Sequence, residues 1–212
     1  MSTPTARTTA GAAMAPVVTI FEHYGAGAAE VGAMVAEALG LPFHAQAFTS
    51  QELEAGEDAG LERNAVLSTV YSAMGGAYGG FEGRDVVTTQ QQKYDLVMDN
   101  NRSLWASAEA GGVIVGRNGA VVLATRPNTV HVLLTGSVED RVARAARTAG
   151  ISPERAAERQ VREDEVRARM STVLYGWDPR LPDRYDVVFN TGRIPLDAVA
   201  QAIVQAVKVG TR

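Results

Sequence analysis

The chain has 212 residues, of which 46% are hydrophobic and 21% charged, and its formal net charge is −4. This composition predicts a soluble globular protein with one sizeable domain, and the negative charge argues against general binding of long nucleic acid, which needs a basic surface. The chain has no cysteine, which excludes disulfides and thiolate metal sites and suits a reducing cytoplasm.

The first fifteen residues are small and polar and lack the apolar stretch of a signal peptide, so they predict a disordered tail. No later run approaches the roughly 20 apolar residues that cross a membrane. We therefore expect a cytoplasmic protein with a single domain over residues 16–212.

The chain from residue 16 to residue 48 predicts a strand, a glycine turn, a helix and a second strand. "PVVTIF" at residues 16–21 is short and β-branched, as buried strands are. Residues 27–40 then place apolar side chains at helical spacing and end at Gly40, a plausible C-cap. "LPFHAQAF" at residues 41–48 looks extended.

The middle of the chain predicts a loop and a long helix. Residues 49–83 are acidic and then rich in glycine, and the stretch "MGGAYGGFEG" that ends this segment is more typical of a surface loop than of a second phosphate site. Residues 86–110 are polar with periodic apolar positions, which indicates a helix.

Three further apolar runs alternate with helical sequence. They are compact and β-branched, as parallel strands buried on both faces are, and they occupy residues 112–116, 129–136 and 185–190. Ser137 and Ser152 predict the N-caps of two helices, and residues 195–208 predict a final one. This order predicts a parallel α/β sheet that binds its ligand beyond the carboxyl ends of the strands.

The glycine turn "FEHYGAGAAEVG" at residues 21–32 has the outline of a phosphate-binding loop. In the pattern G-x-x-x-x-G-K-[ST], with Gly27 as the last glycine, Glu22 replaces the first glycine. Ala28 and Ala29 then replace the lysine and the hydroxyl residue. A Glu22 carboxylate that pointed into the loop would repel a phosphate at about 4 Å by roughly 1 to 4 kcal/mol. A plain strand-to-helix turn is the alternative interpretation.

Two further segments carry arginine. "VIVGRNG" places Arg117 and Asn118 at the end of a strand, where an arginine can bind phosphate and an asparagine a base edge, unless this is a surface turn. Residues 141–169 hold eight arginines and no lysine, typical of a phosphate clamp or of a salt-bridged hairpin. Within it, Asp164 and Arg167 share a helix face, where they could pair with each other or bind a sugar and a phosphate.

Together these segments resemble the cytidylate kinase-like family of P-loop nucleotide kinases over residues 17–207. The resemblance implies a three-layer P-loop NTPase fold, in which helices flank a parallel sheet and a helical lid spans about residues 137–170. It also implies that the loop holds the phosphates of the donor nucleotide through Tyr24, Gly25, Ala26, Gly27 and Ala28.

The resemblance assigns the remaining site residues to an acceptor nucleotide and to the transferring phosphoryl group. Arg117 would bind the acceptor phosphate, and Asn118 stands where the family has an aspartate that reads cytosine. Asp164 and Arg167 would bind the acceptor sugar and phosphate. Arg141 and Arg144 of the lid, with Arg167, would act on the transferring group.

Three functions follow from these patterns. The first is phosphoryl transfer from ATP, with Mg²⁺, to CMP or a related nucleoside monophosphate. The second is a catalytically impaired nucleotide-binding or regulatory protein on the same fold, which the missing lysine favours. The third is a scaffold that binds no nucleotide. No residues predict a protein-held metal site, and the acceptor base, the phosphate donor and the oligomeric state are left open.

Overall fold

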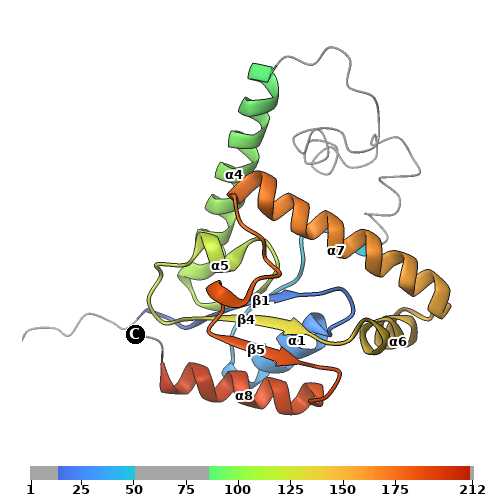
Figure 1. The fold of residues 1–212 in the computed structure, drawn as a ribbon. Helices are drawn as coiled ribbons and strands as arrows, with labels where there is room; N and C mark the ends of the chain where they lie inside the picture. The colour runs from blue at the N-terminus through green and yellow to red at the C-terminus, as the bar shows by residue number, and fades with distance from the viewer. Residues whose placement is uncertain (1–13, 51–85, 211–212) are drawn as a thin grey trace, which may run out of the picture.

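The computed structural model describes residues 14–50 and 86–210. Five strands form one parallel sheet in the order β2-β3-β1-β4-β5 (Figure 1). The strands are β1 Val17–Glu22, β2 Phe43–His44, β3 Gly112–Val115, β4 Thr129–Thr135 and β5 Val187–Asn190. The predicted parallel α/β architecture is confirmed. Residues 1–13 of the N-terminal tail predicted over residues 1–15, and the glycine-rich loop, lie outside the described residues.

The helices begin and end close to the residues that the sequence indicated. Ser137 and Ser152 are N-caps whose Oγ atoms accept from Asp140 N and Arg155 N, and Gly40 is the left-handed C-cap of the first helix. The helices are α1 Ala28–Leu39, α4 Val86–Glu109, α5 Gly119–Val122, α6 Val138–Ala149, α7 Pro153–Tyr175 and α8 Leu196–Val209. A 3₁₀ turn, Pro182–Arg184, precedes β5.

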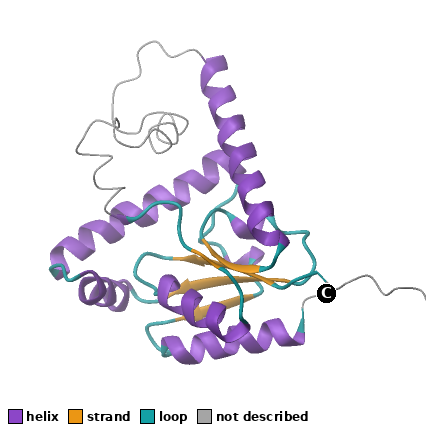
Figure 2. Cartoon of the chain, turned by 180° about the vertical axis from the view of Figure 1, so that it is seen from behind, coloured by secondary structure: helices purple, strands orange, loops and turns teal. Residues whose placement is uncertain are grey.

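Helices cover both faces of the sheet (Figure 2). Side chains alternate along a strand, so Val18 and Ile20 of β1 pack with α1 and α8, whereas Val17 packs with Leu104 of α4 on the opposite face. The predicted three-layer arrangement is therefore confirmed. Among the described residues, no helix is both long enough and apolar enough to cross a membrane.

Parallel pairing brings the carboxyl ends of the strands to one edge of the sheet. Ile20 of β1 lies level with Val115 of β3, and Glu22 lies level with Leu134 of β4. The turn after β1 and the turn after β3 are thus neighbours. Helix α7 runs from α6 to α4 beyond this edge (Figure 1) and completes the region where a ligand of an α/β sheet binds.

The turn after β1 needs glycine for steric reasons. Gly25 has φ +80°, and a Cβ placed on it would lie 2.3 Å from the carbonyl oxygen of Arg141. Gly27 has φ +94°, and its Cβ would lie 2.9 Å from Leu196 Cδ1. The loop therefore packs with its backbone directly against α6 and α8, an approach that side chains at these positions would prevent.

We expect Gly25→Ala to lower the free energy of unfolding by at least about 2 kcal/mol more than Gly40→Ala, because both positions are left-handed but only Gly25 faces a backbone atom. Gly40 is the matched control, since a Cβ placed there meets nothing within 4 Å. Denaturant unfolding of both variants measures the difference. Equal losses would show that the loop does not depend on this close approach.

Candidate functional site

The loop after β1 is held from α7 by Asp164. The Oδ1 atom of Asp164 accepts a hydrogen bond from Tyr24 N at 2.7 Å. Its Oδ2 atom accepts from a terminal nitrogen of Arg141 at 3.0 Å and from Gln160 Nε2 at 2.8 Å. With its two oxygens committed to these groups, Asp164 anchors the loop, and it is not among the residues that line the large cavity described below.

Arg141 and Arg144 of α6 also hold the backbone of the loop. Arg141 is only 4% exposed and donates to Tyr24 O at 2.9 Å and to Gly136 O at 3.1 Å. Arg144 donates to Gly25 O at 2.9 Å and to the hydroxyl and carbonyl oxygens of Thr191. In this structure both arginines therefore bind carbonyl groups behind the loop rather than face an open binding site.

The anion position of the loop is filled by the protein's own carboxylate. Glu22 Oε2 accepts hydrogen bonds from Gly27 N and from Ala28 N, each at 2.9 Å. These amides begin α1, and the N-terminus of a helix favours negative charge. Glu22 thus accepts the two amide N–H groups that an anion at this helix N-terminus would otherwise bind.

The loop does not fit a magnesium-bound triphosphate. Ala28 and Ala29 provide neither the lysine nor the hydroxyl ligand that such a loop uses, and Glu22 adds negative charge. Burial lowers the pKa of His23, so its imidazole is neutral near pH 7 and supplies no substitute charge. Among the described residues, no cluster of three His, Asp or Glu side chains could hold a metal ion.

Arg167 of α7 contacts both the loop after β1 and the segment after β2. One terminal nitrogen lies 3.7 Å from Glu22 Oε1, and the other donates to Glu163 and, at 3.2 Å, to Gln46 Oε1. Glu163 is 1% exposed, and burial raises its pKa against the opposing effect of the Arg167 charge. One guanidinium therefore faces two carboxyl groups, and its single positive charge cannot neutralise both.

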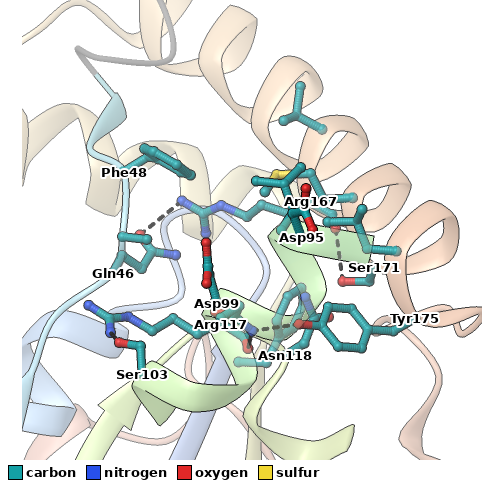
Figure 3. A pocket seen from close by; sticks show the side chains of 18 of the residues that line it. Gln46, Phe48, Asp95, Asp99, Ser103, Arg117, Asn118, Arg167, Ser171 and Tyr175 are labelled. Atoms are coloured by element: carbon teal, nitrogen blue, oxygen red, sulfur yellow. Dashed lines mark hydrogen bonds between the residues drawn. The ribbon is translucent and has the colours of Figure 1, made fainter. Parts of the chain in front are cut away.

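A cavity of about 750 Å³ lies between α4 and α7, and Arg167 forms part of its wall (Figure 3). The segment after β2 and the turn after β3 complete its walls. Its apolar lining includes Phe21, Phe48, Leu96, Val166 and Met170. Its polar lining includes Gln46, Asp95, Asp99, Ser103, Arg117, Asn118, Arg167 and Tyr175.

The turn after β3 is held in a strained conformation. Gly116, Arg117 and Asn118 have φ values of +74°, +56° and +57°, three left-handed residues in succession. Asn100 of α4 donates to Arg117 O at 3.0 Å and thereby fixes the turn from the cavity side. Left-handed residues other than glycine persist only where the surrounding structure imposes them, and such strain is concentrated at ligand sites.

The Arg117 and Arg167 side chains both retain unused hydrogen-bond donors. Within the described part of the chain, the Arg117 guanidinium makes one long hydrogen bond, 3.5 Å to Ser103 Oγ, and its buried Nε atom has no hydrogen-bond partner. The terminal nitrogen of Arg167 that lies 3.7 Å from Glu22 Oε1 is likewise buried and makes no hydrogen bond there, only an ion pair with that carboxylate. Figure 3 shows both guanidinium groups on the side of the cavity where Gln46 lies.

The structure divides the site residues that the sequence indicated into two groups. Arg117, Asn118 and Arg167 line one cavity, whereas Asp164, Arg141 and Arg144 hold the loop. Sequence reasoning missed several residues of this cavity, among them Gln46, Asp95, Asp99, Asn100 and Tyr175. Gln46 had a usable signal, since it follows the second strand at its carboxyl end. The others carry no local pattern.

Comparisons with known proteins identify two curated relatives of this chain. The chain is 33% identical over 109 residues to a cytidylate kinase of Ignicoccus hospitalis, a match that covers 51% of this chain and 62% of that protein. It is 34% identical over 110 residues to a protein named uronate isomerase of Corynebacterium glutamicum, a match that covers 52% of this chain and only 21% of that protein. The chain therefore spans less than two thirds of both curated relatives.

A crystal structure of an uncharacterized protein from Eubacterium ventriosum has the same fold. It covers 92% of this chain and 98% of its own, with a TM-score of 0.63 and 18% identity. The sequence model of the cytidylate kinase-like family matches residues 17–193, which include all five strands and the predicted lid. This chain belongs to the cytidylate kinase-like family.

Proposed function

We propose that this protein binds a nucleoside monophosphate, CMP or a related one, in the cavity between α4 and α7. The observation that carries the proposal is the pair Arg117 and Arg167, which come from different elements and line one cavity, together with the buried Nε atom of Arg117, which has no hydrogen-bond partner among the described residues. Buried donors without partners cost free energy, and a phosphate dianion satisfies guanidinium donors in pairs.

The rest of the cavity suits a nucleoside. Its volume of about 750 Å³ falls in the range of small-molecule sites. Phe21, Phe48 and Met170 provide apolar surface for a base. Asp95 and Asp99 of α4 supply acceptors for sugar hydroxyls, and we propose that they take the part that the family resemblance implied for Asp164.

On the donor side, we propose that transfer from ATP is slow or absent. The donor loop, Tyr24 to Ala28, would have to release Glu22 before it could bind a phosphate chain. Arg141 and Arg144 would have to leave their carbonyl partners before they could act on a transferring group. Removing a single electrostatic contact of this type commonly lowers a rate by about 100- to 1,000-fold.

The second candidate is phosphoryl transfer from ATP, with Mg²⁺, to CMP. It is favoured by membership of the cytidylate kinase-like family and by the name of the Ignicoccus relative. The same arginine-lined cavity would then hold the acceptor. The two candidates differ in whether a bound monophosphate is converted.

We expect isothermal titration calorimetry to detect binding of CMP, dCMP, UMP, AMP or GMP, and Arg117→Ala to weaken that binding by about tenfold or more, because a charge-assisted contact to phosphate is lost. Arg147→Ala, an exposed arginine in the last turn of α6, is the matched control and should leave it unchanged. Diphosphate formation from Mg-ATP is followed in parallel. Rapid turnover would favour the kinase, and no binding of any nucleotide would refute both candidates.

We expect Glu22→Ala to raise the affinity for pyrophosphate and ATP by about tenfold or more, because it frees the amides of Gly27 and Ala28 and removes a repulsion of roughly 1 to 4 kcal/mol. Glu30→Ala removes the same charge from the first turn of α1 but leaves the loop filled, so it separates the two effects. Calorimetry with pyrophosphate measures both variants. If they bind alike, Glu22 does not block the loop.

A further inference from the structure

The orientation of the Asn118 side-chain amide is determined by its neighbour Trp177. Trp177 Nε1 donates to Asn118 Oδ1 at 3.3 Å. An indole N–H can only donate, so the atom of the Asn118 amide that faces Trp177 must be the oxygen. The usual ambiguity between the oxygen and the nitrogen of an asparagine is thereby removed, and Nδ2 points away from the indole.

Trp177 is itself fixed. It is 8% exposed, its ring lies 5.8 Å from that of Tyr185, and Arg184 lies over it at 5.7 Å. Tyr185 in turn contacts Phe21, which follows the buried part of β1. The indole therefore has no freedom to turn its N–H elsewhere, and it acts as a rigid hydrogen-bond donor to the turn after β3.

The backbone of Asn118 is equally constrained. It is the left-handed N-cap of α5, and its carbonyl oxygen accepts from Val121 N and Val122 N. Within residues 14–50 and 86–210, its Nδ2 group has no hydrogen-bond partner, and the residue lines the cavity. The Arg117 side chain has no acceptor atom. The side chains of this turn therefore present only hydrogen-bond donors to the cavity.

We propose that Asn118, oriented by Trp177, selects ligands whose ring edge carries a carbonyl oxygen over ligands that carry an amino group in its place. The inference rests on the proposed nucleotide binding and deepens it. A carbonyl oxygen accepts from Nδ2, whereas an amino group there would set one donor against another and leave both unpaired. Sites built around a hydrogen bond reject analogues that cannot make it.

The test compares nucleotides that differ in this substituent and in the proton on the adjacent ring nitrogen: UMP with CMP, and IMP with AMP. We expect calorimetry to give at least a tenfold lower Kd for the oxo member of at least one pair. Asn118→Asp, whose carboxylate only accepts, should reverse the order of that pair. Trp177→Phe should bring the ratio toward one, because the amide can then turn its oxygen into the cavity.

Trp105→Phe, an exposed tryptophan of α4 outside the cavity lining, is the matched control and should leave the ratio unchanged. Thermal unfolding confirms that each variant is folded. Equal affinities in both pairs, or a preference for the amino members, would overturn the inference and leave the proposed nucleotide binding intact. No binding of any of the four nucleotides would overturn both.

Discussion

The N-terminus of a helix that follows a parallel strand attracts negative charge, and in this protein Glu22 supplies it from within. The carboxylate accepts hydrogen bonds from the amides of Gly27 and Ala28, so these N–H groups of the turn after β1 are paired within the protein. The loop keeps its shape because Gly25 lets it approach α6 and because Asp164 accepts from its backbone. Arg167, which lines the cavity, lies 3.7 Å from this internal anion and so links it to the rest of the site.

The charge of Glu22 also bears on the position of Arg167. A buried carboxylate is stable only when a cation or several donors compensate it, and Arg167 lies close enough to do so. The same guanidinium also donates hydrogen bonds to Glu163 and to Gln46, which lines the cavity. One residue of α7 therefore belongs both to the interior of the loop and to the wall of the cavity, which joins the two halves of the site electrostatically.

The strands and caps could be predicted from the sequence because their signals are local. Periods of apolar residues, Ser152 before a proline, and Gly40 after a helix each act within a few positions. The site could be predicted only in part, because the partner of an arginine lies far away in the chain. Asp164 and Arg167 were correctly placed on one helix, yet Asp164 meets the loop whereas Arg167 reaches the cavity. No spacing rule reveals that division.

The left-handed turn at residues 116–118 has a consequence for the conformational entropy of binding. Its three residues are fixed by Asn100, by Trp177 and by the start of α5 in the free protein. A ligand that meets this turn finds the backbone already ordered, so association there loses less conformational freedom than it would at a flexible loop. The free-energy cost of the left-handed backbone is therefore met when the protein folds. Contacts to a ligand then contribute to affinity with little further loss of conformational entropy.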